Sequence, residues 1–385
     1  MRLLLVTQKV DRTDPILGFF HRWVAEFAKQ CEGVCVIGQL VGEHSFAKNV
    51  KVESLGKESG RARVSQVLRF WSLQWRLRKQ YDAVLVHMTP VWIVLGAPLW
   101  LLLHKRMYLW YEARGTRWPL RIALCFVRKV FSASIHGMPL RTEKSVVVGH
   151  GIDTDFFVPG EGTREEKLLL TVGRITASKN LEVILHAFEQ LPAEYRLMIV
   201  GRPITDADNA LFSVLQQRLA QKHLRKRVTI QPASQDVLLP LLQRATVFVH
   251  ASTTSLDKAV LEAMSSGCIV ISTAEAIQHF LLPVCQATRQ TLDDRIREVC
   301  GLSPGKRKEI AAAQRKHIVE GHSLSMEYGV FGQFSVLKYS STQGINPIPN
   351  THTPHQSLAS QLRMIPVGWA LTWPIPTHMP ETMCV

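Results

Sequence analysis

Short apolar runs alternate with helix-like segments along most of the chain, and this alternation constrains the fold more than any other feature. The strand-like runs of the first half include "RLLLVT", "VCVIG", "YDAVLVHMT" and "MYLWYEA". Those of the second half include "LLLTVGRI", "RLMIVG", "VTIQP" and "TVFVHAS", and the segments between them place apolar residues at helical spacing. Strands that alternate with helices are typical of doubly wound parallel sheets. We therefore predict an α/β fold.

The length of the chain, a linker-like segment and a proline-rich end predict two domains followed by a tail. At 385 residues the chain suits two domains of ordinary size, and segment 157–167, "FVPGEGTREEK", is typical of a linker. We predict domains over residues 1–155 and 156–330, each built on one doubly wound sheet. Residues 347–380 hold seven of the 19 prolines, so the tail over residues 331–385 is expected to be irregular or disordered.

The positive charge of the chain is concentrated in its first part. Residues 1–150 carry 23 Lys and Arg against 10 Asp and Glu, which gives +13 of the total formal charge of +15. A basic surface suits nucleic acid, an anionic membrane or a phosphorylated substrate. Because the cations lie on helices without base-stacking aromatic motifs or a zinc finger, we do not expect nucleic acid to be the partner.

Cysteine usage and hydropathy indicate a cytoplasmic protein. The seven cysteines are widely spaced and form no paired CxxC motifs, so we expect neither disulfides nor a metal site. The start, "MRLLLVTQKV", is typical of a first strand rather than of a secretory signal. The longest apolar stretch, residues 91–103, is too short to span a bilayer. It predicts a core helix, with an interfacial helix as the alternative.

One acid stands on an otherwise apolar helix in "SLDKAVLEAMSSGCIVIS", residues 255–272. We predict a helix capped by Ser255, a stop at Gly267 and then a buried strand. In such units, ligands bind at the carboxyl ends of the strands, so Glu262 and the loop before the helix are expected to border a crevice. The alternative is that Glu262 is a solvated helix residue.

Two cations follow a predicted strand in "TVGRITASKNLEVILHAF". Arg174 comes directly after the strand, and Lys179 stands at the start of the next helix. The helix start also offers backbone N–H groups and a favourable dipole, so this point suits an anion such as a diphosphate. The alternative is that both are solvated surface cations.

Four segments occur in a fixed order: "GHGIDTDFFVPG", "TVGRITASKNLEVILHAF", "LMIVGRP" and "LDKAVLEAMSSGCIVIS". They resemble the carboxyl half of family 4 glycosyltransferases, and the amino half is similar in "MRLLLVTQKVDRTDPILGFFHRWVAEFA" and "DAVLVHMTPVW". The resemblance covers about residues 1–328. It implies the GT-B fold, in which two Rossmann-like domains face each other across a cleft. The amino-terminal domain would then lie on the acceptor side, and the carboxyl-terminal one would bind the nucleotide sugar.

The resemblance implies roles for individual residues. Glu262 matches the second glutamate of the family's E-x7-E element, which binds the ribose hydroxyls. Arg174 and Lys179 match the diphosphate-binding pair, and we expect them to be catalytic. The other expected donor-binding residues are Gly18, Gly173, Gly201, Thr254, Ser255, Leu256 and Asp257. The weaker acceptor-side candidates are His21, Glu112, Arg114 and His150.

The chain departs from the family pattern in three places. Thr254 stands where the first glutamate of the E-x7-E element is expected, and Asp257 is the acid that could meet the donor sugar instead. Residues 112–115 lack the histidine that the family often has there. Gly18 stands alone where the family often has a glycine pair, so its phosphate contact is less firmly implied.

The implied activity is transfer of a sugar from a nucleoside-diphosphate sugar with retention of configuration, without a metal or other cofactor. The expected acceptor is a cell-envelope or polysaccharide precursor, a glycan or a lipid-linked one. A catalytically impaired, sugar-nucleotide-binding pseudoenzyme is the alternative.

A location at the membrane is also expected. Phe70, Trp71 and Trp75 lie among arginines in "VLRFWSLQWRLRK", which suits peripheral docking on the anionic inner face of the cytoplasmic membrane. The alternative is a soluble basic surface with buried aromatic side chains.

Overall fold

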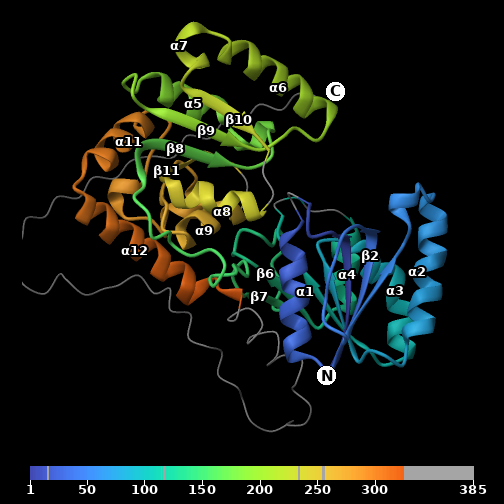
Figure 1. Cartoon of the computed structure of the whole chain (residues 1–385). Helices are drawn as coiled ribbons and strands as arrows, with labels where there is room; N and C mark the ends of the chain where they lie inside the picture. Colours follow the sequence, from blue (N-terminus) through green and yellow to red (C-terminus); the bar gives the residue numbers. More distant parts are fainter. Residues whose placement is uncertain (15–16, 114, 116–117, 233–234, 254–255, 325–385) are drawn as a thin grey trace, which may run out of the picture. The chain divides into compact units, whose positions relative to one another are not determined.

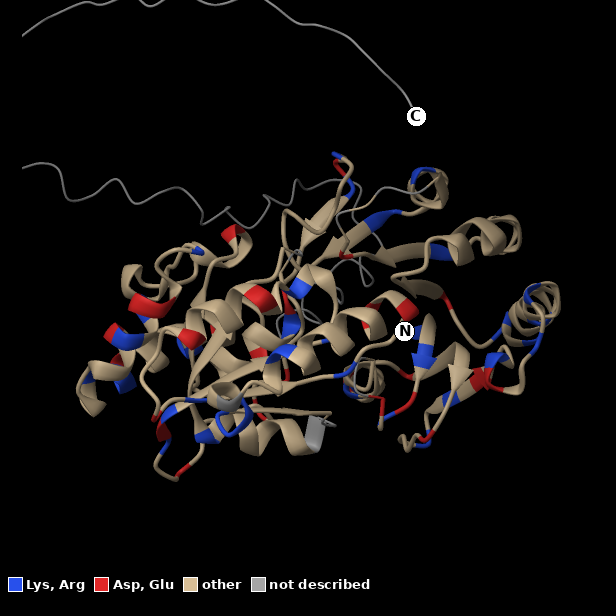
Figure 2. Ribbon diagram, turned by 90° about the horizontal axis from the view of Figure 1, so that it is seen from above, with Lys and Arg blue, Asp and Glu red and all other residues tan. Residues whose placement is uncertain are grey.

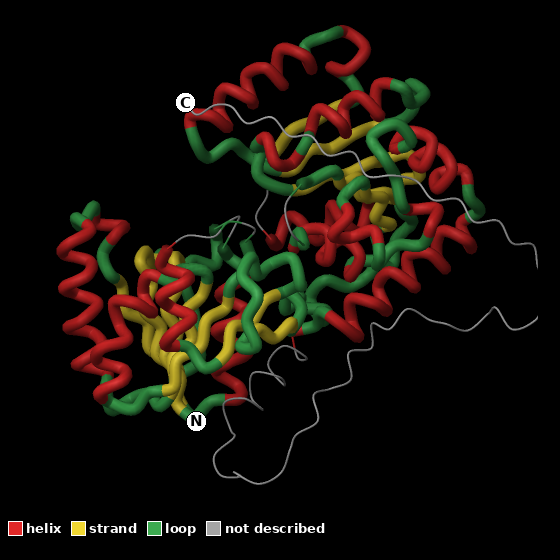
Figure 3. The backbone as a smooth tube through the Cα atoms, turned by 180° about the vertical axis from the view of Figure 1, so that it is seen from behind, coloured by secondary structure: helices red, strands yellow, loops and turns green. Residues whose placement is uncertain are grey.

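The computed structural model describes residues 1–14, 17–113, 115, 118–232, 235–253 and 256–324. Within them the chain forms two parallel β-sheets, one of seven strands and one of five, each packed against helices (Figure 1). Figure 3 shows the strands of each sheet in yellow with helices in red along them. Every strand pair in both sheets is parallel, which confirms the predicted α/β fold.

The first sheet has the strand order β3-β2-β1-β4-β5-β6-β7. Its elements are β1 (Arg2–Val10), α1 (Phe19–Gln30), β2 (Gly33–Val41), β3 (Val50–Ser54), the 3₁₀ turn η1 (Lys57–Ser59), α2 (Arg63–Leu77), β4 (Ala83–His87), α3 (Val91–Leu102), β5 (Arg106–Trp110), α4 (Trp118–Phe126), β6 (Lys129–Ser132) and β7 (Ser145–Val147).

Alternate residues of β1 belong to two separate cores, because successive side chains of a strand point to opposite faces of its sheet. Leu3 and Leu5 belong to the core that contains the buried face of α1. Leu4 and Val6 belong to a second core with residues of α2, α3 and α4. Helices therefore cover both faces of the sheet, and this is why its strands are continuous apolar runs.

The second sheet has the strand order β10-β9-β8-β11-β12. Its elements are β8 (Glu165–Val172), η2 (Ala177–Lys179), α5 (Leu181–Glu189), β9 (Arg196–Val200), α6 (Asp206–Leu219), α7 (Lys222–Arg225), β10 (Val228–Gln231), α8 (Gln235–Arg244), β11 (Ala245–His250), α9 (Lys258–Ser265), β12 (Ile269–Ser272), α10 (Glu275–Gln278), η3 (Pro283–Cys285), α11 (Leu292–Gly301) and α12 (Pro304–Gly321).

One local expectation needs correction. The helix predicted within residues 255–272 begins at Lys258, and its N-cap is Asp257, which makes no side-chain capping bond, so the predicted cap at Ser255 is misplaced. Of the three aromatic residues singled out on α2, Trp71 and Trp75 are exposed and Phe70 is fully buried. The alternative of buried aromatic side chains therefore holds for Phe70 and is wrong for the two tryptophans.

The expectations for the apolar stretch and for the cysteines can be compared with the described part of the chain. Helix α3 is a core helix over Val91–Leu102, and no described helix is long and apolar enough to cross a membrane. The described cysteines, all but Cys384, are free thiols. The boundary predicted at residues 155/156 stays a prediction, and the tail over residues 331–385 lies outside the described residues.

Candidate functional site

The topology of the second sheet marks one point for a ligand. The chain runs from β8 outward to β9 and β10, then returns to the other side of β8 to form β11 and β12. Ligands of open parallel sheets bind at such a switch point, beyond the carboxyl ends of the two strands that flank it. The predicted cations Arg174 and Lys179 follow β8, and the loop that leads to Glu262 follows β11.

Hydrogen bonds join the two loops at this point. Asn180 has a positive φ of 48°, and its Nδ2 donates to the carbonyl of Ala251 over 2.9 Å. The backbone N–H of Thr253 donates to the carbonyl of Ser178, also over 2.9 Å. The loops after β8 and β11 are therefore held together as one unit.

Two of the three predicted donor-binding glycines, Gly173 and Gly201, are required by close approaches of the backbone. A Cβ on Gly201 would lie 1.9 Å from the carbonyl oxygen of Gly173. Gly173 itself has a φ of +152°, and a Cβ there would lie 3.0 Å from Cε of Lys179. These glycines let the loop after β8 lie against β9 and let the Lys179 stem pass over the backbone.

Lys179 is paired with a carboxylate. Its Nζ lies 2.6 Å and 2.5 Å from the two carboxylate oxygens of Asp257, and each side chain is 17% exposed. Nε2 of His250 lies 2.9 Å from Oδ2 of Asp257, and Nδ1 of His250 lies 2.8 Å from Oγ of Ser272. The ionised carboxylate of Asp257 can only accept, so Nε2–H of His250 donates to it, and Nδ1 of the neutral ring accepts from the hydroxyl of Ser272. The Oγ of Ser272 also accepts a bond from the N–H of Ala274.

This network fixes the charge states of its members. Burial alone would raise the pKa of Asp257, but the hydrogen bond from His250 and the charge of Lys179 outweigh it and hold that pKa far below its ordinary value. Burial lowers the pKa of His250, which keeps the ring neutral near pH 7. Asp257 was expected to meet the donor sugar, but in this structure its carboxylate is occupied by Lys179 and His250.

Arg174 differs from Lys179 in having no ion-pair partner among the described residues. Its side chain is exposed at the carboxyl end of β8. The positive charge available to an incoming anion is therefore mainly that of Arg174, with Lys179 supplying donors from a neutralised pair.

The Asp257→Asn variant is expected to be less stable than the wild type at pH 7 by about 1–2 kcal/mol. Both partners reach solvent, so Lys179 can rehydrate, and the loss stays below that of a fully buried pair. A depressed carboxyl pKa stabilises the fold above the ordinary pKa near 4, and that stabilisation disappears as the pH falls below it.

Urea unfolding at pH 7, 5 and 3.5 measures this difference. The gap between wild type and variant should be the same at pH 7 and pH 5 and should narrow at pH 3.5, below the ordinary carboxyl pKa. A gap that stays constant or widens toward pH 3.5 would show that Asp257 gains nothing from its ionised form.

Glu262 lies in a different setting from Lys179. It is buried on α9 with 4% exposure, and its Oε1 has no hydrogen-bond partner. It borders a small pocket with ≈ 190 Å³ of space between atoms, part of it open to solvent. The lining residues are Phe19, Arg22, Trp23, Gly151, Asp153, Phe157, Lys258, Glu262 and Leu324.

Much of that space is open to solvent, and the enclosed part has room for about one water-sized group, so it can admit only a small part of a ligand. Burial raises the pKa of Glu262 to about 7, against the opposing charges of Lys258 and Arg22. A carboxyl group of this kind lacks the hydrogen bonds it needs, and a pair of ligand hydroxyl groups would supply them. The solvated alternative for Glu262 is wrong, because the residue is buried.

Lys258 ties α9 to the first helix and to the segment between the sheets. Its Nζ lies 3.3 Å and 3.2 Å from the carbonyl oxygens of His150 and Gly151, and 4.3 Å from the ring centre of Phe19. Phe19 is the first residue of α1, so the starts of α1 and α9 meet here. Gly18 directly precedes this contact, and a Cβ on it would lie 2.5 Å from the carbonyl oxygen of Asp14.

His150 and Leu256 lie near the same contact between the starts of α1 and α9. Nε2 of His150 lies 3.2 Å from the carbonyl of Leu256, so this nitrogen carries the proton, and Nδ1 is buried without a partner. Burial lowers the pKa of His150 to about 3, so the ring is neutral. Leu256 was expected to contact the donor, but its side chain is buried in the core.

The remaining acceptor-side candidates have other partners than the residues at this contact between α1 and α9. His21 stacks on Phe46 with ring centres 4.1 Å apart, and its Nε2 accepts a bond from the N–H of Ser45. The carboxylate of Glu112 accepts bonds from the N–H groups of Ala133 and Ser134 and thereby anchors the end of β6. Contact of either residue with an acceptor stays a prediction. Arg114, Thr254 and Ser255 lie outside the described residues.

Sequence reasoning missed three residues that the structure brings to the site. His250 ends β11, and its position at the carboxyl end of a central strand could have identified it. Lys258 and Arg22 carry no local signal, because their importance depends on the contact between α1 and α9. Among the described residues, no group of His, Cys, Asp and Glu side chains could hold a metal ion.

A family model described as "Glycosyl transferases group 1" matches residues 166–284. The chain carries a group 1 glycosyltransferase domain. The match spans the segment from β8 to η3 and includes Arg174, Lys179 and Glu262. It supports a glycosyltransferase enzyme and agrees with the resemblance found in the sequence, although it does not distinguish family 4 within group 1.

Solved glycosyltransferase structures share the whole architecture. HepE from Anabaena, solved in complex with UDP, has a TM-score of 0.68 at 16% identity, covering 88% of this chain and all of HepE. Sucrose-phosphate synthase from Thermosynechococcus elongatus has a TM-score of 0.71 at 15% identity, covering 87% of this chain and 98% of that one. A glycosyltransferase from Rickettsia africae has a TM-score of 0.66 at 14% identity, covering 88% and 100%.

These likenesses confirm the GT-B fold. At identities this low they show the fold alone. No curated protein sequence matches the chain significantly.

Proposed function

We propose that this glycosyltransferase moves a sugar from a nucleoside-diphosphate sugar, with uridine as the base, to an acceptor hydroxyl, and that it retains the anomeric configuration. The observation that carries the proposal is the group 1 match over residues 166–284, which contains both predicted diphosphate ligands and the buried carboxyl of Glu262. Uridine is supported by the similar structure of HepE, which was solved with UDP and with UDP-glucose.

The chemistry follows from the charges at the switch point. The bond between the anomeric carbon and the diphosphate oxygen breaks, and its electron pair leaves with the diphosphate. Arg174 and the Lys179–Asp257 pair stabilise the growing negative charge on that group. The acceptor oxygen bonds to the anomeric carbon on the same face, and its proton passes to the departing phosphate oxygen. No enzyme nucleophile and no metal or other cofactor is part of this proposal.

The proposed acceptor is a glycan or lipid-linked precursor of the cell envelope or of a polysaccharide. We place the enzyme in the cytoplasm, peripherally on the inner face of the cytoplasmic membrane. This placement is supported by the net charge of +13 in residues 1–150.

A thermal-shift screen of common nucleoside-diphosphate sugars tests the donor. A ligand that binds only the folded state raises the unfolding midpoint, by about 2.7 kcal/mol of added stability at 100 times its dissociation constant. We expect a UDP-sugar to raise the midpoint by several degrees and the matching GDP-sugar to leave it unchanged. If none of the donors raises the midpoint, the proposed donor class is wrong.

A second measurement tests transfer itself. Incubation with the bound donor and candidate acceptors should release UDP, and the anomeric coupling constant of the product should match that of the donor. Donor binding without hydrolysis or transfer to any acceptor would instead favour the pseudoenzyme. The domain match favours the enzyme over that alternative.

A further inference from the structure

Helix α2 presents apolar side chains to solvent as well as to the core. Its exposed stripe is Val64, Leu68, Trp71 and Trp75, which are 71%, 59%, 45% and 54% exposed. Their spacing of three and four residues puts them on one face of the helix. The opposite face packs on the core through Phe70, Leu73 and Leu77 and also buries Gln66 and Gln74. A helix whose outer face only met water would carry polar side chains there.

The buried side of α2 shows what this arrangement costs. Both side-chain polar atoms of Gln74 are buried without a hydrogen-bond partner. An unpartnered buried amide destabilises a fold, so the inner face of α2 is not optimised for stability alone. A contiguous apolar patch on the surface of a protein typically marks an interaction site.

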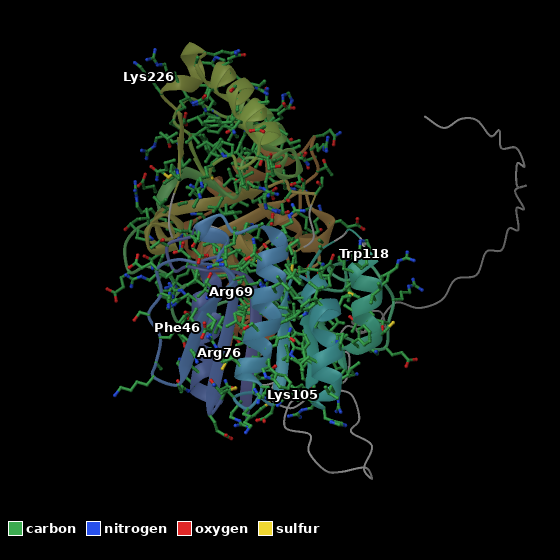
Figure 4. The ribbon with its side chains drawn as sticks, turned by 90° about the vertical axis from the view of Figure 1, so that its right-hand side faces the viewer. Phe46, Arg69, Arg76, Lys105, Trp118 and Lys226 are labelled. Carbon is green, nitrogen blue, oxygen red and sulfur yellow. The ribbon has the colours of Figure 1, made fainter. Side chains whose placement is uncertain are left out.

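The neighbouring helices extend the apolar surface. Leu101 and Leu102 at the end of α3 are 51% and 71% exposed, and Trp118 on α4 is 64% exposed. Nε1 of Trp71 donates to the carbonyl of Leu95 over 2.9 Å, which fastens α2 to α3. Figure 4 looks onto this side of the first sheet's helices, with Arg69, Arg76, Lys105 and Trp118 labelled. We refer to Val64, Leu68, Trp71 and Trp75 of α2, with Leu101 and Leu102 of α3, as the α2 surface.

The charge along α2 has a single sign. Residues 61–79 contain six Lys and Arg and no Asp or Glu. In Figure 2 the helix at the right-hand end is α2, and its ribbon is marked in blue without red. Arg76 pairs with Glu53 over 2.6 Å, and Arg78 lies over the ring of Trp75 at 4.2 Å. Arg61, Arg63 and Lys79 are exposed at the two ends of the helix.

We infer that the α2 surface docks this enzyme on an anionic phospholipid membrane. Tryptophan rings settle at the level of the lipid headgroups, and arginine stems lie along apolar surface while their guanidinium groups reach the phosphates. A helix that lies flat in the interface needs this combination of an apolar stripe with flanking cations. The inference deepens the proposed function by naming the face that meets the membrane, and it rests on that function.

The charge pattern selects the lipid over a second copy of the chain. Two α2 surfaces brought together would set the exposed cations of one copy, Arg61, Arg63 and Lys79, near those of the other, and these repel. An anionic lipid surface instead attracts every exposed cation at once, and that attraction weakens in high salt.

Flotation of the full-length protein with vesicles tests the inference. Wild type is expected to float with phosphatidylcholine vesicles that contain phosphatidylglycerol, to stay behind with phosphatidylcholine alone, and to be released by high salt. The test variant is Val64→Ser/Leu68→Ser/Trp75→Ser, which leaves the Trp71 hydrogen bond intact. The matched control changes three exposed apolar residues of the second half, Ile204→Ser/Val214→Ser/Val319→Ser.

We expect the test variant to lose at least tenfold in vesicle partitioning and the control to match wild type. Arg61→Gln/Arg63→Gln/Lys79→Gln should show a comparable loss, whereas Arg225→Gln/Lys226→Gln/Lys308→Gln should not. An unchanged unfolding midpoint and an unchanged donor-induced shift show that each variant is folded.

The outcomes separate this inference from the proposed function. No binding of wild type to anionic vesicles at low salt, or equal binding by the test variant, overturns the docking surface, even where a UDP-sugar still raises the midpoint. Self-association that the test variant abolishes, without vesicle binding, assigns the surface to a second copy and also overturns the inference. Vesicle binding by wild type that the test variant loses supports the docking surface, even where no donor binds and the proposed function fails.

Discussion

Replacement of Arg174 by alanine is expected to lower turnover roughly a hundredfold, comparable to the loss of one preorganised stabilising group. Arg174 is exposed beyond β8 and has no ion-pair partner among the described residues, so its charge is available to the diphosphate. The charge of that group grows as the bond to the sugar breaks. The loss should therefore appear in kcat more than in KM.

Steady-state kinetics with the donor found by thermal shift measure this split. The matched control is Arg225→Ala, which removes an exposed cation from α7, away from β8. Equal kcat in wild type and the Arg174 variant would rule out the diphosphate role, and so would an equal loss in the control.

Lys179 differs from Arg174 because it is already paired with the carboxylate of Asp257, so its effect should depend on that residue. Lys179→Ala leaves the carboxylate of Asp257 without its cation and next to the diphosphate position, so turnover should again fall roughly a hundredfold. The double variant Lys179→Ala/Asp257→Asn removes both charges and should recover part of that loss. A double-mutant cycle isolates this coupling. Strictly additive effects would mean that the pair does not act as a unit.

The fold was predictable because each strand carries its own signal. Leu3 to Val6 of β1 are buried on both faces of the sheet, so the strand is a continuous apolar run that the sequence shows directly. The places of Arg174, Lys179 and Glu262 in the fold were predictable for a similar reason, since each stands at a fixed distance from such a strand or from a helix stop. Their roles stay predictions.

The rest of the site depends on contacts between distant segments. The pairing of Asp257 with Lys179 joins residues 78 positions apart, and the sequence shows only that an acid precedes the helix. The contact of Lys258 with Phe19 joins the two halves of the chain. Which aromatic residues of α2 face solvent could not be predicted, because helical spacing gives the angle between side chains but not which side faces the sheet.

The surroundings of Glu262 predict that binding and stability oppose each other at this position. The unfolded carboxyl titrates near pH 4.5, whereas burial raises its pKa to about 7 in the fold. The unfolded state therefore loses its proton first, and each pH step between these values favours unfolding. This penalty is absent below pH 4.5, grows up to pH 7 and is constant above it, at no more than about 3 kcal/mol.

Glu262→Gln should remove that penalty while keeping the shape of the side chain. We expect the variant to be more stable than wild type at pH 8, by up to about 3 kcal/mol, and equal to it at pH 4. Urea unfolding at pH 4, 6 and 8 measures the difference. Glu182→Gln, an exposed position on α5, serves as the control and should show no such trend. A stability difference that does not grow from pH 4 to pH 8 contradicts the buried, raised pKa.

Donor affinity should change in the opposite direction. Glu262→Ala removes both acceptors for the ribose hydroxyls and should weaken donor binding by about 1.5–3 kcal/mol, the range for hydrogen bonds to a charged group. Glu262→Gln keeps one acceptor and should lose less. Because only the ionised carboxylate accepts from two hydroxyl groups, wild-type affinity should rise as the pH increases through 7, while that of Glu262→Gln stays flat. Calorimetry at pH 6, 7 and 8 decides the matter, and unchanged affinity in the alanine variant would show that Glu262 does not hold the ribose.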